Sequence, residues 1–255
     1  MSHNNPDNHI VQIQGLTKSY GNANTVLNGI NAHIKKGERV ALIGSNGSGK
    51  STLLKCIIGL HPFSNGEVKV MGETFNKTPS SKQRKNIRLK TGFIFQQHCL
   101  VRRRSVLSNV VHGMLGNKGS WRGFSHHTAP NEWRTNAMTA LHKVNLSEKI
   151  LNRADSLSGG QQQRAAIARA LVRDPSLIIA DEPAASLDPV AGKEVMSIFS
   201  ELCKDNGITL LFTSHDMEHT LEFSDRVIAL KNGVVHFDKS SDSVSDKDLE
   251  IVFNG

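Results

Sequence analysis

The sequence predicts an α/β fold in which a parallel β-sheet core carries an N-terminal antiparallel β subdomain and an inserted α-helical subdomain. The first observation is the stretch 44–51 (Gly-Ser-Asn-Gly-Ser-Gly-Lys-Ser), which follows an apolar strand and opens an apolar helix. The second is the alternation of short apolar runs with helical patterns over 157–240, which favours parallel strands joined by helices. The third is the segment 97–156, where apolar residues recur at helical spacing. We therefore expect one domain over 10–240, with its core in 10–96 and 157–240.

Length and composition are those of a protein with one sizeable hydrophobic core. The chain has 255 residues, of which 38% are hydrophobic, and this suffices for one large domain or a domain with an inserted lobe. No apolar run approaches the roughly 20 residues of a membrane-spanning helix, and the polar start 1–9 does not have the pattern of a signal peptide. We therefore expect a cytosolic protein in which residues 1–9 are disordered. The three cysteines lack metal-ligand spacing, which favours reduced structural thiols.

The net charge of +8 is scattered along the chain. Its densest run is Arg102-Arg103-Arg104, and no aromatic residue is interleaved with it. Because aromatic residues make up only 5% of the chain, a surface that stacks on nucleic-acid bases is disfavoured. A solvated face or a contact with a membrane partner is the better interpretation of this run.

The first part of the chain predicts short strands on both sides of the stretch 44–51. Strands are expected at 10–13, 26–34, 40–43, 66–72 and 91–95. The first two are predicted to be antiparallel. Tyr20, the only tyrosine, falls in the loop that we expect between them. There it either packs locally or offers a flat surface to a purine ring.

The rest of the chain predicts helices, followed by an alternation of helices and strands. Helices are expected around 106–115 and 137–144 and at 162–172, 190–204 and 217–223, and strands at 177–180, 208–213, 226–230 and 234–237. The stretch 118–131 carries Gly, Ser and Pro130 next to the pair His126 and His127. Without a third ligand nearby in sequence, a surface loop is a better interpretation than a metal site. Residues 241–255 are expected as a C-terminal tail.

The stretch 44–51 carries the clearest chemistry. Gly44, Gly47 and Gly49 allow backbone angles that side chains disfavour, so that successive N–H groups can face phosphate oxygens at a helix start. Lys50 would then reach the β- and γ-phosphates, and Ser51 offers a hydroxyl to Mg²⁺. The alternative is a Gly/Ser-rich turn that binds nothing, and the flanking strand and helix make it the weaker interpretation.

Polar residues follow the buried strands at one expected edge of the sheet. Gln96 ends one strand, where a ligand contact and a merely hydrophilic terminus fit equally well. Asp181 and Glu182 end another, and acids there favour a site because they are costly unless paired or metal-bound. His215 follows a third strand. The stretch 157–161 (Leu-Ser-Gly-Gly-Gln) opens a helix with two glycines and is a second potential phosphate cradle.

In this order, and with Ser186-Leu187-Asp188, these motifs resemble those of ATP-binding-cassette (ABC) ATPases, which have a P-loop NTPase (RecA-like) core. The resemblance covers essentially residues 10–240, and Leu-Ser-Gly-Gly-Gln is its most specific part. It implies ATP and Mg²⁺ as ligands. It also implies a head-to-tail homodimer, in which 157–161 close on ATP held by a second copy of the chain. A monomeric P-loop kinase or GTPase is the competing class.

The resemblance assigns roles to residues of this chain. Those implied to bind the nucleotide are Tyr20 on adenine, then Gly44, Ser45, Asn46, Gly47, Ser48, Gly49, Lys50, Ser51 and Thr52 on the phosphates, and Ser158, Gly159, Gly160 and Gln161 on the partner's nucleotide. Those implied at the metal are Ser51 as a direct ligand, Asp181 through water, and Gln96. Those implied in catalysis are Glu182, which would polarise the attacking water, His215, which would contact the γ-phosphate, and Gln96, which would link the site to the helical lobe.

A narrower resemblance is to the ATP-binding subunits of phosphonate importers. It rests on Phe95-Gln96-Gln97, 104–110, 113–116 with Trp121 nearby, and 181–189. His98-Cys99 and the stretch 117–131 depart from that pattern.

This narrower resemblance implies an ATPase subunit that couples ATP hydrolysis to the uptake of phosphonate or a related phosphorus oxyanion. Its expected partners are two transmembrane permease subunits, docked near 97–116, and indirectly a solute-binding protein, with no nucleic acid among them. The expected location is peripheral, on the cytoplasmic face of the bacterial inner membrane. One alternative is an importer for amino acids or another small polar nutrient. The other is a non-transport ABC ATPase acting on DNA or ribosomes, but the long coiled coils or second cassette of such relatives are not found in this sequence.

Overall fold

The larger of two β-sheets is built mainly from parallel strands. The structure, a computed structural model, describes residues 8–21, 24–116 and 120–253. The strands of this sheet are β3 (Arg39–Ile43), β6 (Thr91–Ile94), β7 (Leu177–Ala180), β8 (Thr209–Thr213), β9 (Arg226–Lys231) and β10 (Val234–Ser240). Their order is β10-β9-β3-β8-β7-β6, and only the pairing of β10 with β9 is antiparallel. The predicted parallel-sheet core is confirmed.

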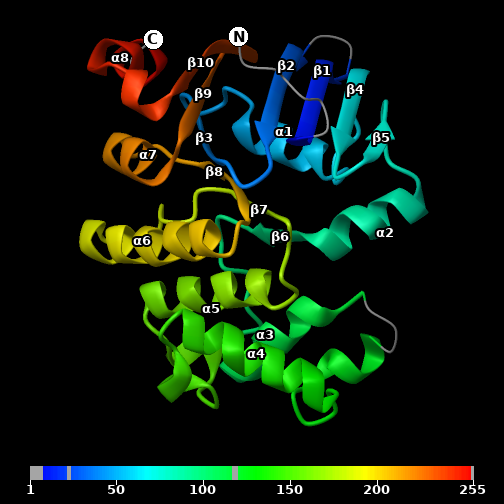
Figure 1. Cartoon of the computed structure of the whole chain (residues 1–255), viewed down its shortest axis with the longest axis vertical. Helices are drawn as coiled ribbons and strands as arrows, with labels where there is room; N and C mark the ends of the chain where they lie inside the picture. Colours follow the sequence, from blue (N-terminus) through cyan, green and yellow to red (C-terminus); the bar gives the residue numbers. More distant parts are fainter. Residues whose placement is uncertain (1–7, 22–23, 117–119, 254–255) are drawn as a thin grey trace.

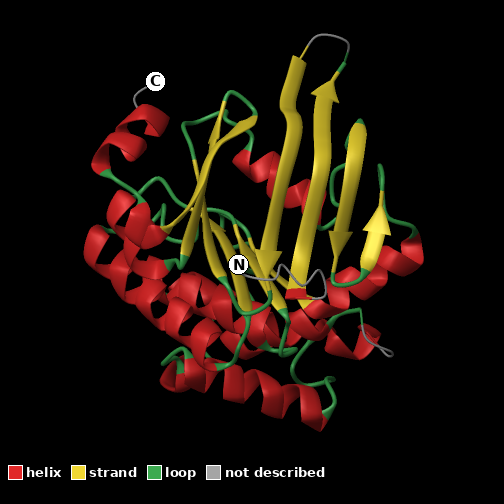
Figure 2. Ribbon diagram, turned by 45° about the horizontal axis from the view of Figure 1, so that its top comes forward, coloured by secondary structure: helices red, strands yellow, loops and turns green. Residues whose placement is uncertain are grey.

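The second sheet is antiparallel and stands beside the first (Figure 2). Its strands are β1 (His9–Tyr20), β2 (Asn24–Lys35), β4 (Asn65–Val70) and β5 (Glu73–Phe75), in the order β2-β1-β4-β5. The predicted N-terminal antiparallel subdomain is confirmed, but Tyr20 was wrongly expected in a loop. It is the last residue of β1, which stays paired with β2 as far as Tyr20 and Asn24.

The N-terminal boundary also differs from the expectation of disorder over 1–9. His9 begins β1, and the carbonyl of Asn8 accepts a hydrogen bond from the N–H of Lys36 at 2.9 Å. His9 therefore belongs to the sheet, and Asn8 is hydrogen-bonded to the residue that follows β2. The remainder of that expectation, residues 1–7, lies outside the described residues.

Helices cover the sheets, and several of them gather at one end of the molecule. They are α1 (Lys50–Ile57), α2 (Ser81–Lys90), α3 (Val106–Val111), α4 (Asn131–Lys143), α5 (Gly159–Leu171), α6 (Pro189–Asp205), α7 (Met217–Phe223) and α8 (Asp246–Phe253). Short 3₁₀ turns are η2 (His112–Met114), η3 (Ser120–Phe124), η4 (Ser147–Lys149), η5 (Ala154–Ser156) and η6 (Ser241–Ser243). Figure 1 shows α3, α4 and α5 together in the lower part, which confirms the inserted helical subdomain. In the described parts of the chain, no helix combines the length and apolar character that a membrane crossing requires.

Alternate residues of the buried strands face two hydrophobic clusters. In β3, Val40 and Leu42 pack with α1 and the antiparallel sheet, whereas Ala41 and Ile43 pack with the cluster that includes α3 to α6. Side chains alternate between the two faces of a strand, so both faces are covered. This explains why such strands are continuous apolar runs in the sequence.

The carboxyl ends of β3, β6, β7 and β8 meet at one edge of the sheet. Ile94 of β6 pairs with Ala180 of β7, Ala180 pairs with Phe212 of β8, and Leu42 of β3 pairs with Thr213. The strands run in the same direction, so the residues that follow them leave the sheet together. This is the edge at which open α/β sheets place their ligands.

The C-terminal segment is folded onto the core. We expected 241–255 as a tail, but 241–243 form η6 and 246–253 form α8. Leu249 and Val252 are buried in the same cluster as α3 to α6. Residues 254–255 lie outside the described residues, and the exact division of the chain into core and helical parts stays a prediction.

Candidate active site

The loop between β3 and α1 requires glycine where the backbone passes close to other groups. Gly44 has φ +152°, and a Cβ built there would lie 2.3 Å from the carbonyl oxygen of Leu230 and 2.5 Å from the Ser48 Oγ. Gly49 has φ +103°, and a Cβ there would lie 2.6 Å from a methyl of Leu27. A side chain at either position would therefore force the loop out of this shape.

The loop and the helix start that follows it present polar groups that can bind an anion. No side chain caps the N-terminus of α1, whose N-cap is Gly49. The Oγ of Ser48 is buried and has no hydrogen-bond partner among the described residues. Uncapped N–H groups and an orphaned hydroxyl at a helix start are suited to phosphate oxygens. The residues present therefore fit a nucleotide phosphate.

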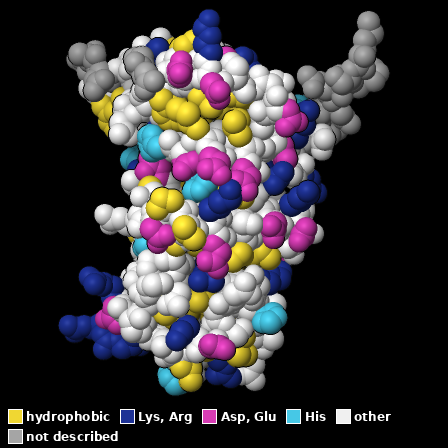
Figure 3. All heavy atoms as spheres, turned by 90° about the vertical axis from the view of Figure 1, so that its left-hand side faces the viewer, with side chains coloured by type: hydrophobic (Ala, Val, Ile, Leu, Met, Phe, Trp, Pro, Cys, Tyr) yellow, Lys and Arg dark blue, Asp and Glu magenta, His cyan; other side chains and the backbone are white. Residues whose placement is uncertain are grey.

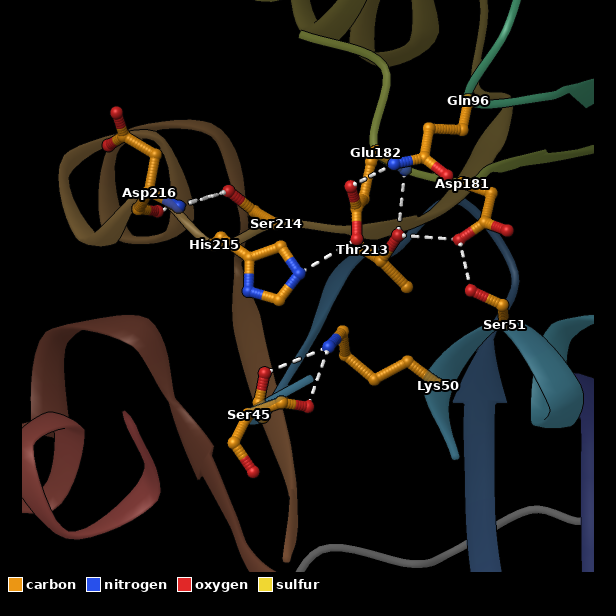
Figure 4. A network of polar contacts seen from close by, with 11 residues as sticks. Ser45, Lys50, Ser51, Gln96, Asp181, Glu182, Thr213, Ser214, His215 and Asp216 are labelled. Carbon is orange, nitrogen blue, oxygen red and sulfur yellow. Dashed lines mark hydrogen bonds and ion pairs between the residues drawn. The ribbon is translucent and has the colours of Figure 1, made fainter. Parts of the chain in front are cut away.

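Lys50 is folded back over the loop (Figure 4). Its Nζ donates to the carbonyl oxygens of Gly44 at 2.8 Å and Ser45 at 3.1 Å. Burial lowers the pKa of the Lys50 ammonium, and the nearby carboxylates of Glu182 and Asp181 partly oppose this shift. A buried cation whose hydrogen bonds to the described residues go to carbonyl oxygens is well placed to exchange them for a phosphate.

Asp181 lies at the end of β7 and is held by two hydroxyl groups. Its Oδ1 accepts from the Ser51 Oγ at 2.9 Å and from the Thr213 Oγ1 at 3.0 Å, and the residue is only 6% exposed. A carboxylate next to a serine hydroxyl provides the oxygen ligands that Mg²⁺ prefers. The same Thr213 oxygen accepts from the backbone N–H of Glu182 at 2.8 Å. Thr213 was missed by the sequence analysis.

Glu182 is held from two sides. Its Oε2 accepts from the Gln96 Nε2 at 2.8 Å, and its Oε1 lies 2.7 Å from the His215 Nε2. Its backbone adopts φ +51°, which is unusual for a residue with a side chain and is found at strained functional positions. The structure thus brings together Gln96, Glu182 and His215, which follow β6, β7 and β8 (Figure 4).

The segment 158–161 is not part of this network. The Ser158 Oγ accepts from the N–H of Gln161 at 3.4 Å, and the Gln161 Oε1 accepts from the N–H of Ser158 at 3.1 Å, which closes a capping box at the start of α5. Ser158 and Gly159 are exposed. Among the described residues, no hydrogen bond joins this segment to the loop before α1.

Among the described residues, no hydrogen bond joins the side chain of Tyr20 to the network around Glu182. Tyr20 is 47% exposed, and the Nζ of Lys18 lies 4.3 Å from the centroid of its ring. The ring therefore has an accessible surface at the end of β1.

Comparisons with known proteins agree with the fold. The family model described as ABC transporter matches residues 27–185. The chain is 42% identical over 246 residues to a phosphonates import ATP-binding protein of Maricaulis maris, covering 94% of this chain and 92% of that protein. It is 40% identical over 250 residues to a protein with the same description from Pseudomonas syringae pv. syringae, with coverages of 96% and 90%.

Solved structures give the same result. One is an ATP-binding cassette in a dimeric, post-hydrolysis state bound to ADP and Pi, with a TM-score of 0.78 and 34% identity, covering 91% of this chain and 98% of that one. Another is a subunit of an ABC transporter complex from Clostridium perfringens, with a TM-score of 0.81, 30% identity, and coverages of 95% and 93%. The chain belongs to the ABC transporter family.

Proposed function

We propose that this chain is the ATP-hydrolysing subunit of an importer for phosphonate or a related phosphorus oxyanion. The main support for ATPase activity is the network at the sheet edge. There Lys50, Asp181 and Glu182 lie close together beside a helix start that is suited to bind an anion. Phosphoryl transfer to water needs positioning and charge neutralisation more than covalent chemistry, and these residues supply both. The relatives named above, which are described as phosphonates import ATP-binding proteins, support the substrate.

Each residue of the network has a defined task in this proposal. The residues 44–52 bind the phosphates and Tyr20 stacks on adenine. Ser51 directly, Asp181 through water, and Gln96 would hold Mg²⁺, which would neutralise charge on the phosphates. Glu182 orients and polarises the attacking water, and its contacts with Gln96 and His215 fix the direction of its carboxylate.

The working unit in this proposal is a head-to-tail homodimer with two ATP molecules at its interface. Ser158 and Gly159 are exposed and are not hydrogen-bonded to the phosphate loop of their own chain. A second copy would present its nucleotide to them. The related cassette described as dimeric supports this arrangement.

The partners are two transmembrane permease subunits and, through them, a solute-binding protein. The chain would lie peripherally on the cytoplasmic face of the membrane.

Nucleic acid is not among the partners. On the face formed by α6, α7 and α8, acidic side chains lie between the basic ones rather than leaving a basic stripe (Figure 3), and Lys193 there pairs with Glu218 at 2.7 Å and Glu222 at 2.9 Å.

The test is growth of a deletion strain, with no other phosphonate importer, on phosphonate, phosphite or phosphate as sole phosphorus source. The gene for the natural chain should restore growth on phosphonate, and Glu182→Gln should not, because its amide binds and orients the attacking water far less well. Purified Glu182→Gln should bind ATP and lose at least about a hundredfold in hydrolysis. Glu194→Gln, on the exposed side of α6, is the matched control and should behave as the natural chain.

Two results would contradict the proposal at different levels. Full ATPase activity of Glu182→Gln would remove the role given to that residue. Unimpaired growth of the deletion strain on phosphonate would leave an ATPase and overturn the substrate. An importer for amino acids or another small polar nutrient would then be the better proposal.

A further inference from the structure

The C-terminal helix brings an aromatic ring close to His215. Phe253 is the last residue of α8, and its ring centroid lies 6.3 Å from that of His215, with the two planes at 59°. This is within the separation at which aromatic pairs attract each other. The segment from 241 onwards has no task in the mechanism proposed above, so this contact needs an explanation of its own.

Phe253 is held in place by the packing of α8. Leu249 and Val252 are 1% and 0% exposed, and they belong to the same core cluster as Val227 and Ala229 of β9. Both residues lie one turn or less before Phe253 on a short helix. The backbone that carries the ring is therefore anchored to the core, and the partly buried Phe253 side chain packs against the same cluster.

Two lysines of β9 and β10 add polar anchors to α8. The Nζ of Lys239 lies 2.7 Å from the Asp248 Oδ1. The Nζ of Lys231 donates to the carbonyl oxygen of Ile251 at 3.0 Å, near the C-terminal end of the helix, where a cation is favourable. Both ends of α8 are thus attached to the edge of the parallel sheet.

His215 depends on few contacts for its orientation. Its side chain is 33% exposed, and in the part of the chain that the structure describes, its hydrogen bond is the one between Nε2 and Glu182. The backbone on its C-terminal side is fixed, because the N–H of Asp216 donates to the Ser214 Oγ at 3.0 Å. The ring can still rotate about its side-chain torsions unless a neighbour restricts it.

We propose that Phe253 is a positioning residue for His215, so that the C-terminal helix keeps the imidazole directed at Glu182. The inference rests on the proposed function, since it assigns to α8 the upkeep of the hydrolytic site. Without the Phe253 ring, His215 samples other rotamers, and the carboxylate of Glu182 loses one of its two supports. Residues 44–52 and Tyr20, to which the proposed function assigns most of the nucleotide binding, lie outside this contact, so we expect ATP binding to change much less than turnover.

The experiment compares the steady-state ATPase of the full chain with that of Phe253→Ala, Phe253→Tyr and Ile251→Ala. Phe253→Ala should lower kcat about three- to tenfold with the ATP KM within twofold, as expected for loss of one aromatic contact. Phe253→Tyr keeps a ring and should restore kcat. Ile251→Ala is the matched control, because this exposed residue of α8 is attached to Lys231 only through its backbone.

A second background separates positioning from a general loss of stability. In His215→Ala, the further change Phe253→Ala should have little effect on kcat, because no ring remains to be positioned. An equal fall in both backgrounds, or unchanged kcat in Phe253→Ala, would overturn the inference. If the natural chain shows no ATPase activity, the proposed function fails.

NMR spectra of the chain with labelled histidine test the contact between Phe253 and His215 independently of activity. A His215 signal that has the same chemical shift in Phe253→Ala as in the natural chain would overturn the inference.

Discussion

At the scale of single residues, one hydroxyl fixes both acids of the candidate site. The Thr213 Oγ1 donates to Asp181 and accepts from the N–H of Glu182. It is fully buried, so neither bond competes with water. Threonine is common in strands because its side chain is branched at Cβ. The sequence of residues 208–213 therefore gave no reason to assign Thr213 a functional role. Its position as a hydroxyl at the carboxyl end of a buried strand is the signal that could have found it.

We expect Thr213→Val to lower kcat for ATP hydrolysis about ten- to a hundredfold, with a smaller effect on ATP affinity. The substitution keeps the shape of the side chain and leaves the buried carboxylate of Asp181 and the partly buried N–H of Glu182 each without one partner. Such a loss costs about 1–3 kcal/mol. Turnover at saturating ATP and Mg²⁺ measures the effect.

Thr209→Val is the matched control for Thr213→Val. Thr209 lies in the same strand and is also fully buried, but its hydroxyl accepts from the N–H of Gly37, away from the site. It should lower stability by a similar amount and leave kcat unchanged. Equal kcat in the two variants would show that Thr213 contributes stability alone.

At the scale of elements, two helices begin with the same capping box. In α2 the Ser80 Oγ accepts from the N–H of Gln83 at 3.3 Å, and in α5 the Ser158 Oγ accepts from the N–H of Gln161 at 3.4 Å. Loss of either cap should cost about 1 kcal/mol of stability. The two serines differ in the proposed function, because only Ser158 contacts a partner's nucleotide.

We therefore expect Ser158→Ala to lower ATPase activity about tenfold or more, since a hydrogen bond to a charged phosphate is worth about 1.5–3 kcal/mol. Ser80→Ala should lose only stability. Sedimentation in the Glu182→Gln background should show an ATP-dependent dimer that Ser158→Ala weakens and Ser80→Ala does not. A strict monomer of Glu182→Gln with saturating ATP and Mg²⁺ would contradict the dimer.

The elements also show what the sequence can and cannot predict. β3, β7 and β8 are buried on both faces, and all three were predicted as strands from their largely apolar sequences. Ile87 is the only buried residue of α2, so its basic sequence has no apolar periodicity to reveal a helix. β5 has three residues, which is too short for a pattern. Tyr20 was placed in a loop because polar neighbours concealed the pairing of β1 with β2.

At the scale of the whole molecule, three of the predicted site residues are ones that the sequence places after buried strands. Parallel strands bring such positions to one edge whatever the intervening sequence, and Gln96, Glu182 and His215 therefore meet as expected. The contact between Phe253 and His215 has no such rule behind it. It depends on how α8 packs on β9, which local sequence patterns do not contain.

The helical end of the molecule carries an apolar groove suited to a membrane subunit. Its volume is about 390 Å³, and its lining is Val101, Arg104, His112, Leu115, Ser120, Trp121 and Phe124. Trp121 is 79% exposed and Phe124 is 69% exposed, which is costly unless a partner covers them. Arg104 lies over the Phe124 ring at 4.9 Å, so a partner helix with an apolar face and an acidic residue would match the groove. The groove overlaps the region 97–116 in which we predicted docking.

We expect the double substitution Trp121→Ala and Phe124→Ala to abolish co-purification with the permease subunits and growth on phosphonate. The ATPase activity of the isolated subunit should stay within twofold, because the groove does not contain a residue of the hydrolytic network. Leu151→Ala is the matched control, since Leu151 is also apolar and 73% exposed but does not line the groove. Buried aromatic anchors dominate the energy of such interfaces, so two of them should decide the outcome. If the double variant still assembled with the permease subunits and supported growth, the docking site would have to lie elsewhere on the chain. Co-purification of the natural chain with ribosomes or DNA, in place of membrane proteins, would overturn the proposal that it is a transporter subunit.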